Sequence, residues 1–417
     1  MKIVTAIIVL ILLTDILHAD ITVCNDCEIN SISKAVEIAE PGSTIYVRQG
    51  TYHESLILIK KSLSLIGIDN PVIIAKNGDQ VFTLSGDNIT IKGFTIKNVE
   101  KSYVEDRAAI KSIKSSNITI EGNTLINTFF GIYFANTQNS RIRNNIVHGN
   151  AKEQNSSANA IHVWYCDSLV IENNETFGHR DGIYLEFVNH SRIENNYSKS
   201  NLRYGLHFMF SDNDKYYHNT FENNGAGVAV MYSNQIEMMS NKFIKNWGAS
   251  SYGLLLKEIK DSRIERNYFF ENTIGIYAES AIRCDILHND FESNGWALKL
   301  LGSCEQNTIS KNNFVSNTFE LATNKNARNY NTYEYNFWSA YSGYDLNKDG
   351  IGDVPHKPIE LFSTIISDSP HAIILIRSIF VDMMNLAEKI IPVLTPENLS
   401  DPKPLMKRIK HDKVLQY

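Results

Sequence analysis

Histidine and methionine residues near the middle of the chain could bind a soft metal ion. His207 and Met209 lie two positions apart, and Met231 follows Met209 after 22 residues. Thioether sulfur and imidazole nitrogen are ligands that suit Cu(I). Met239 is a fourth copper candidate, while its neighbour Met238 is expected to point into the protein. The methionines could instead form an apolar patch that a loop or a partner protein covers, so both interpretations stay open.

A second polar group could support acid–base catalysis. His179, Arg180 and Asp181 are consecutive, and Glu186 follows after five positions. A histidine beside carboxylates can serve as general acid and base. This group would suit a carbohydrate-active protein, either a uronate epimerase or a polysaccharide lyase. We find no second carboxylate cluster stacked with this one, so a turn rich in polar residues is the preferred explanation.

Oxygen-bearing side chains towards the C-terminus match the first part of a calcium-binding loop. Asp345, Asn347, Asp349 and Asp353 occupy relative positions 1, 3, 5 and 9, with glycine at position 6. Side chains at this spacing surround Ca²⁺ in loops of the EF-hand type. The glutamate expected at position 12 is replaced by His356. A structural calcium ion and a simple Asp/Gly-rich turn are both compatible with the pattern.

The elements that must position these residues are short, repeated strands. Short β-branched and aromatic runs are separated by Asn and Gly, not by helical patterns, which argues against βαβ units. A fixed period of this length is the mark of a solenoid. The sequence therefore predicts an all-β fold, a right-handed parallel β-helix with coils of about 22 residues. The asparagines that mark the period stand at positions 123, 145, 174, 196, 219, 241, 267, 289 and 313.

The repeat also predicts which side chains face outward. Alternate residues of a strand point to opposite faces of its sheet. The apolar Leu206 and Phe208 are expected inside, which places His207 and Met209 outside. Stacking of successive coils would then bring Met209 next to Met231 on the outer surface.

The first residues have the pattern of a secretory signal. Residues 1–19 hold one early lysine, a run from Ile3 to Leu13 that is apolar apart from Thr5, and a small residue, Ala19, before Asp20. This order of charged, apolar and small residues is typical of an exported protein. The apolar run is too short to span a bilayer comfortably, so we expect cleavage after Ala19.

The charge of the chain argues against nucleic-acid binding, and its cysteines are compatible with an oxidising compartment. A net charge of −6 with interspersed signs provides no basic stripe for nucleic acid, so no nucleic-acid partner is expected. Cys24 and Cys27 are expected to form a local disulfide in an oxidising compartment, with a metal-binding dithiol as the alternative. Small core or turn positions are expected for the other three cysteines, Cys166, Cys284 and Cys304.

The chain divides into a cap, the repeat and a C-terminal region. Residues 20–43 are expected to cover the open N-terminal end, with a helix over residues 31–40. Residues 44–338 form the β-helix, and residues 339–370 form a connector that contains the calcium-type loop.

An amphipathic helix is expected over residues 371–392. It would either plug the C-terminal end of the β-helix or dock on a membrane-associated partner. Residues 393–417, rich in proline, are expected to form an extended tail. The apolar residues expected to dock are Ile373, Ile376, Phe380, Met383 and Ile390.

Four segments resemble the NosD family of periplasmic accessory proteins, namely Arg203–Asp214, Asn224–Ser233, Tyr252–Ser262 and Gly343–Phe362. The resemblance implies a β-helix without catalytic turnover of its own. Such a protein works with an ABC transporter, made of a membrane permease and a cytoplasmic ATPase. Together they supply copper-sulfur centres to nitrous oxide reductase.

The resemblance also implies roles for particular residues. It strengthens the interpretation of His207, Met209 and Met231 as a Cu(I) site. It provides the predicted C-terminal helix with a partner, the periplasmic side of the permease, so that membrane contact runs through the permease at the inner membrane. The client would be apo nitrous oxide reductase. Cys24 and Cys27 do not belong to the family pattern, and their role stays open.

Overall fold

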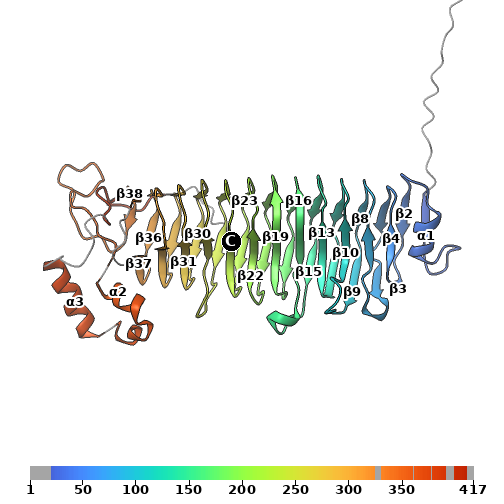
Figure 1. The fold of residues 1–417 in the computed structure, drawn as a ribbon, viewed down its shortest axis with the longest axis horizontal. Coiled ribbons are helices and arrows are strands. Elements are labelled where there is room, and N and C mark those ends of the chain that lie inside the picture. Colours follow the sequence, from blue (N-terminus) through green and yellow to red (C-terminus); the bar gives the residue numbers. More distant parts are fainter. Residues whose placement is uncertain (1–19, 325–329, 360, 377, 391–398, 411–417) are drawn as a thin grey trace, which may run out of the picture.

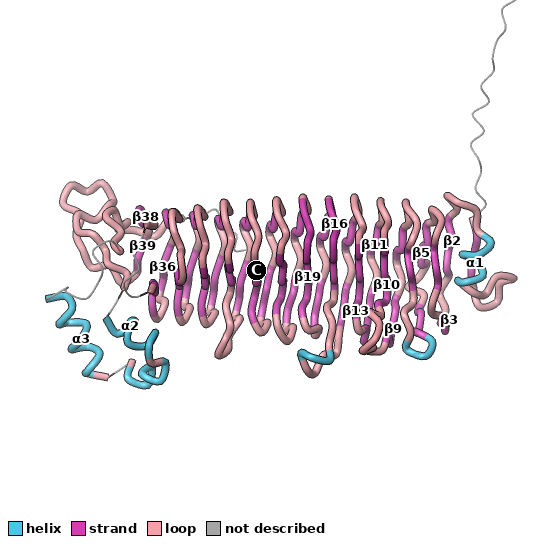
Figure 2. The backbone as a smooth tube through the Cα atoms, viewed as in Figure 1, coloured by secondary structure: helices cyan, strands magenta, loops and turns pink. Residues whose placement is uncertain are grey.

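The computed structural model describes residues 20–324, 330–359, 361–376, 378–390 and 399–410. These residues form one long right-handed solenoid in which each coil stacks on the one before it (Figure 1). Figure 2 shows that strands dominate the body and that helices lie mainly at its two ends. The fold class predicted from the repeat is confirmed. The predicted signal at residues 1–19 lies outside the described residues.

The first of three parallel sheets runs the whole length of the described solenoid. Its short strands expose one face and bury the other, as their alternating burial shows. In spatial order, they are β1 (Ile21–Val23), β2 (Thr44–Val47), β5 (Ser64–Gly67), β8 (Thr90–Lys92), β11 (Thr119–Glu121), β14 (Arg141–Arg143), β17 (Val170–Glu172), β20 (Arg192–Glu194), β23 (Lys215–Tyr217), β26 (Glu237–Met239), β29 (Arg263–Glu265), β32 (Asp285–Leu287), β35 (Thr308–Ser310) and β38 (Thr332–Glu334).

The second sheet holds the longest strands and carries most of the candidate site. Its strands are β4 (Ile57–Ile59), β7 (Phe82–Leu84), β10 (Ala108–Ile113), β13 (Phe130–Ala135), β16 (Ile161–Asp167), β19 (Asp181–Asn189), β22 (Tyr204–Met209), β25 (Ala226–Met231), β28 (Leu254–Lys257), β31 (Ile274–Glu279), β34 (Trp296–Leu301) and β37 (Phe319–Thr323). Leu206 and Phe208 point inward from β22, as the alternation predicts.

The third sheet completes each coil. Its strands are β3 (Thr51–Glu54), β6 (Val72–Ala75), β9 (Thr95–Val99), β12 (Thr124–Thr128), β15 (Ile146–His148), β18 (Glu175–Phe177), β21 (Tyr197–Lys199), β24 (Thr220–Glu222), β27 (Lys242–Ile244), β30 (Tyr268–Phe270), β33 (Asp290–Glu292), β36 (Asn313–Val315) and β39 (Phe337–Trp338). Two short 3₁₀ turns, η1 (Lys76–Gly78) and η2 (Gln154–Ser156), lie in connections that leave this sheet.

Aromatic rings stack inside the solenoid behind the third sheet. The rings of Phe243, Phe269, Phe291, Phe314 and Trp338 follow one another at centroid distances of 4.5, 4.8, 5.0 and 4.1 Å. All five side chains are buried. Burying one such side chain contributes about 2 kcal/mol, so this column is a major part of the core.

A ladder of buried asparagines ties the coils together at the turn between the first and third sheets. The side-chain oxygen of Asn174 accepts hydrogen bonds from both the backbone N–H and the Nδ2 of Asn145, each at 3.0 Å. The Nδ2 of Asn145 also donates to the Ile120 carbonyl at 2.9 Å. The same pattern repeats from Asn123 to Asn336.

One position of this turn differs from the sequence prediction. The ladder member near its end is Asn312, not Asn313, whose side chain bonds to Asp290 and Ile409 instead. In addition, the left-handed backbone conformation falls on the residue before the ladder position, such as Asn144 with φ 54°. The ladder position therefore depends on the asparagine amide, while the residue before it takes a positive φ whether it is an asparagine or a residue such as Arg266.

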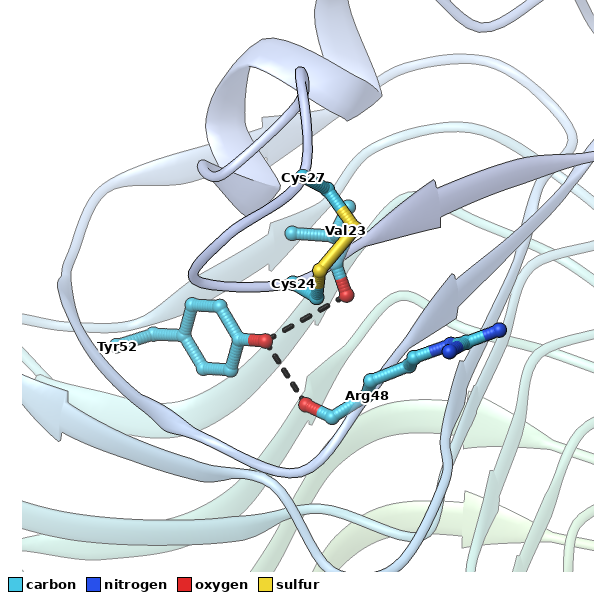
Figure 3. The surroundings of a disulfide bond; sticks show 5 residues. All are labelled: Val23, Cys24, Cys27, Arg48 and Tyr52. Atoms are coloured by element: carbon cyan, nitrogen blue, oxygen red, sulfur yellow. Dashed lines mark hydrogen bonds between the residues drawn. A yellow bond between two sulfur atoms is a disulfide. The ribbon is translucent and has the colours of Figure 1, made fainter.

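The N-terminal end is covered by α1 (Ile32–Ile38) and a small disulfide loop. Ser31 caps the helix by accepting a hydrogen bond from the Lys34 N–H. Cys24 and Cys27 form a disulfide, the first of the two alternatives from the sequence. Figure 3 shows this loop beside Tyr52, whose hydroxyl donates to the Arg48 carbonyl at 2.8 Å.

The C-terminal region forms three short helical segments, and the last two of them lie where one helix over residues 371–392 was expected. They are α2 (Leu361–Asp368), η3 (Pro370–Leu375) and α3 (Ile379–Ile390). Ser378 precedes α3, and serine favours a helix N-terminus over a helix interior. Val381 and Phe362 pack on Trp296 and Phe319 at the end of the second sheet. Among the described residues, no helix is both long and apolar enough to cross a membrane.

The described part of the predicted tail, residues 399–410, is bound to the solenoid. Leu405 pairs with Phe337, and Arg408 forms ion pairs of 3.1 Å with Asp290 and Glu292. Asp401 closes the asparagine ladder, because its Oδ2 accepts from the N–H and Nδ2 of Asn336 at 3.0 and 3.1 Å. This segment therefore covers the last coil as part of a C-terminal cap.

Replacing Asp401 with alanine should destabilise the C-terminal coils. The same Oδ2 accepts from the Trp338 Nε1–H at 3.0 Å, so three buried donors would lose their partner. We expect a loss of about 3 kcal/mol in the free energy of unfolding, measured by urea denaturation. Asp401→Asn, which keeps one acceptor oxygen, should lose less. Equal stability of Asp401→Ala and the wild-type chain would contradict this assignment.

Candidate functional site

The outer face of the second sheet carries a row of aromatic and imidazole rings. His162 stacks between Tyr133 and Tyr184 at centroid distances of 4.7 and 4.8 Å. Tyr184 then meets His207 edge-on at 5.0 Å. These residues come from β13, β16, β19 and β22, which pair in register in successive coils. The row explains why an outward-facing histidine can still be shielded from water.

His207 lies deep in this row. Its side chain is 2 % exposed, and its ring centroid is 4.8 Å from that of Tyr204. Burial, together with the charges of Arg203 and Arg180, lowers the pKa of His207 to about 3. Neither ring nitrogen has a hydrogen-bond partner among the described residues. His207 is therefore a neutral imidazole with one unprotonated nitrogen, the form that binds metals.

The structure brings together three of the four copper candidates. Met209 follows His207 on β22 and pairs in register with Met231 on β25, and both methionines are half-buried. Met239 also faces outward, but it lies on β26 of the first sheet, between Tyr217 and Glu265. No cluster of three or more His, Cys, Asp or Glu residues suited to a metal ion occurs in the described residues. A copper site here therefore depends on the methionine sulfurs.

The predicted acid–base group is divided between the interior and the surface. Asp181 is fully buried, and burial raises its pKa. Its Oδ1 accepts from the Tyr204 N–H at 3.2 Å, and its Oδ2 lies 3.4 Å from the Arg180 Nε. Glu186 lies on the outer face and accepts from the Tyr184 hydroxyl at 3.1 Å. A pair of carboxylates across an open cleft, which glycoside cleavage needs, is not formed by these residues.

The calcium-type loop has a compact turn structure. Asp345 Oδ2 accepts from the Gly350 N–H at 2.9 Å, and Asp353 Oδ2 accepts from the Leu346 N–H at 2.7 Å. The Oδ1 of Asp345 is shielded and has no partner in the described part of the chain, so it could bind a cation. Asn347 and Asp349 bond to each other. The donor set is compatible with calcium, whose binding stays a prediction.

The predicted docking residues lie mainly on the solvent side of the C-terminal segments. Ile373, Phe380 and Met383 are exposed, whereas Ile376 packs partly against the end of the second sheet. The side chain of Ile390 lies outside the part that the structure describes. Four further apolar side chains of these segments are also exposed, namely Ile374, Leu375, Ile379 and Leu386.

Sequence reasoning missed a second row of aromatic rings beside the methionines. The rings of Tyr165, Phe187, Phe210 and Tyr232 stack at centroid distances of 4.4, 5.1 and 5.0 Å. All four residues have a left-handed backbone, which is uncommon for bulky side chains. Three of them are exposed large apolar residues. Their spacing of 22 or 23 residues was the signal that could have revealed them.

The fold and this surface define the class as a right-handed β-helix protein with an apolar, histidine-containing outer face. Residues 150–343 match the family described as "Periplasmic copper-binding protein (NosD)", and residues 19–159 match the family "Right handed beta helix region". The chain is therefore similar to the NosD family over its middle part and to the β-helix family over its first part. The first match includes His207, Met209 and Met231.

Two curated relatives carry the description "Probable ABC transporter binding protein NosD". The protein of Pseudomonas aeruginosa is 27 % identical over 78 % of this chain and 80 % of its own length. The protein of Stutzerimonas stutzeri is 24 % identical, and the alignment covers 43 % of this chain and 44 % of that relative. The chain thus aligns with less than half of one relative and with most of the other.

Solved structures with the same fold include an epimerase and an adhesin. The mannuronan C-5 epimerase AlgE6 A-module of Azotobacter vinelandii superposes with a TM-score of 0.59 at 15 % identity, covering 72 % of this chain and 91 % of that one. The surface adhesin PfbA of Streptococcus pneumoniae gives 0.56 at 13 % identity, covering 71 % and 88 %. At these identities the likeness shows the fold alone.

Acid should weaken the folded state through the buried histidines. Burial lowers the pKa of His162 to about 3 from 6.5, so the unfolded chain takes up this proton first as the pH falls. Stability is then complete above pH 6.5 and is lost as the pH falls towards about 3. We expect His162→Phe, which keeps the ring stack, to reduce this slope by about 1 kcal/mol per pH unit, measured by urea denaturation at several pH values.

Tyr133→Phe is the matched control for this experiment. Burial raises the pKa of Tyr133 to about 12, far above the acid range, so this variant should keep the wild-type slope. Identical slopes for His162→Phe and the wild-type chain would show that His162 does not titrate as the structure implies.

Proposed function

We propose that the chain is a periplasmic accessory protein that works with an ABC transporter to supply copper to nitrous oxide reductase. It would act without catalytic turnover of its own, by holding Cu(I) and docking partners. The observation that carries the proposal is the match to the periplasmic copper-binding family over residues 150–343, which includes His207, Met209 and Met231. The relatives described as ABC transporter binding proteins support the transporter partner.

Three residues would hold the metal ion. His207 offers a neutral imidazole whose nitrogens are free of other hydrogen bonds in the described structure. Met209 and Met231 stand on the same outer face in successive coils and add thioether sulfurs. Soft, neutral ligands favour Cu(I) over harder cations and release it readily. Copper would be cargo in this mechanism, bound for transfer to another protein.

The exposed aromatic row beside the methionines would assist that transfer. Phe210 follows Met209 and Tyr232 follows Met231 in the sequence, so two rings border the proposed copper ligands. Exposed aromatic side chains are enriched at protein interfaces. Apo nitrous oxide reductase, docking over these rings, would exclude water from the metal while it changes ligands.

The C-terminal helices would make the contact with the permease. Phe380 and Met383 on α3 are exposed, while Val381 on the same helix is buried against the solenoid. One side of α3 is therefore anchored, and the other is available to a partner. Exposed apolar helix residues of this kind fit a groove in a membrane protein. Inner-membrane association would follow from this contact.

Removing both methionine sulfurs should weaken copper binding. We expect Met209→Leu with Met231→Leu to raise the Kd for Cu(I) by about tenfold or more, because leucine keeps the volume and loses the soft ligand. The measurement is an anaerobic titration against a Cu(I) chelator. Met239→Leu is the matched control and should bind as the wild-type chain does, since it lies on another sheet. Unchanged titration of the double variant would reject the site.

Polar substitutions on α3 should prevent assembly with the transporter. We expect Phe380→Ser with Met383→Ser to lose co-purification with the permease while keeping the wild-type unfolding temperature, because both side chains are exposed. Leu58→Ser with Ile146→Ser changes two exposed apolar residues elsewhere and serves as control. A deletion from residue 371 onward would also remove Asp401 and the C-terminal cap. Undiminished co-purification of the α3 variant would refute the docking role.

A further inference from the structure

A cleft of about 460 Å³ lies at the corner between the third and second sheets, apart from the proposed copper ligands. Its floor is a tight turn, in which the single residue Phe129 joins β12 to β13. The connections of the coils on either side are long, residues 100–107 after β9 and residues 149–160 after β15. Figure 2 shows the η2 insertion projecting from the lower edge of the solenoid. A short turn between two long ones leaves a depression.

The connection of residues 149–160, which contains η2 and forms one wall of the cleft, is fixed to the solenoid by hydrogen bonds. The Ala151 N–H donates to the Gly178 carbonyl at 2.9 Å, and the Arg180 N–H donates to the Ala158 carbonyl at 2.9 Å. Ser157 bonds back to the Glu153 carbonyl at 2.6 Å. These contacts hold the insertion in place from both ends. The cleft is therefore preformed, as binding sites for small molecules usually are.

Two buried polar side chains line the cleft and lack partners. Thr128 is 6 % exposed and His179 is 2 % exposed. The Thr128 hydroxyl and the His179 Nε2 have no hydrogen-bond partner among the described residues. Buried polar atoms nearly always have a hydrogen-bond partner in folded proteins. The Thr128 hydroxyl and the His179 Nε2, both at this cleft, therefore indicate that a ligand binds here.

The cleft offers hydrogen bonds without net charge. The amides of Asn98, Asn127 and Asn150 line it. The opposite charges of Glu100 and Lys101 stand together at its wall. Burial lowers the pKa of His179 to about 4, so its ring is neutral at neutral pH. These groups both donate and accept, which suits a ligand rich in hydroxyl groups.

We propose that this cleft binds a short, uncharged oligosaccharide. The half-buried ring of Phe129 provides an apolar platform for a sugar ring, and the amides, hydroxyl and imidazole around it pair with sugar hydroxyls. The cleft would bind and not cleave, because Glu100 is the one carboxylate among its lining residues and glycoside cleavage uses two. The bound glycan would hold the protein near periplasmic or envelope polysaccharide.

The test is direct binding to the full mature chain. Saturation-transfer NMR with cellotetraose, mannotetraose, chitotetraose and an oligomannuronate should show contact for at least one neutral oligosaccharide at about 1 mM. Contact with cellotetraose or mannotetraose would indicate a glucan or mannan as the source, whereas contact with chitotetraose would indicate a peptidoglycan-type source. Contact with the oligomannuronate alone, or with none of the four, would overturn the proposal.

Matched threonine variants locate the site. Thr128→Val should weaken binding by about tenfold, since it removes one hydroxyl with little change in shape. Thr176→Val is the control, because Thr176 also has a buried, unpaired hydroxyl in the described chain but does not line the cleft. Equal weakening by both variants, or by neither, would refute the site. Phe129→Ala should also weaken binding, and it tests the platform independently. The same variants should bind Cu(I) as the wild-type chain does, because the proposed copper ligands do not line the cleft. The two proposals can therefore fail independently.

Discussion

The solenoid depends on hydrogen bonds that link buried asparagines in the turns of successive coils. Strand residues and most turn residues pair through their backbones, but the backbone N–H of each ladder asparagine, such as Asn145, donates to a side-chain oxygen of the next coil. At the main corner the side-chain oxygen of Asn174 accepts two hydrogen bonds from Asn145 of the preceding coil, and its Nδ2 donates to the Ile142 carbonyl of that coil and to Asn196 of the next. A buried donor without such a partner would destabilise its coil by about 1–3 kcal/mol. The repeated asparagine is therefore required at every turn of this kind.

Each of the two long asparagine ladders ends at a residue that does not follow the repeat, namely Asp401 and His179. The main ladder ends on Asp401, a residue from far along the chain, and this contact closes the C-terminal end. A second ladder runs from Asn201 to Asn317, and the position before Asn201 is His179. His179 takes the place of an asparagine at the near end of this ladder, and it lines the cleft.

Burial on the outer face keeps several ionisable groups neutral. His162 and His207 lie among tyrosine rings, which shield them from water while leaving the His207 nitrogens without partners. Met209 and Met231 border this shielded row, and exposed aromatic rings border the methionines. A soft metal ion and a partner protein could therefore meet on one surface. The C-terminal helices and the cleft proposed to bind an oligosaccharide lie elsewhere, so the proposed contacts need not compete.

The sequence by itself determined the fold, the coil period and the alternation of inward and outward side chains, because a stacked repeat expresses all three in its spacing. It also placed Met209 beside Met231. It could not decide between Asn312 and Asn313, since adjacent asparagines fit the period equally. Only the tertiary structure placed Met239 on a different sheet, because a coil has three outer faces and the period does not distinguish them. It also decided that Asp401 closes the ladder and that His179 lines a cleft, since these contacts depend on chain returns and insertions that break the repeat.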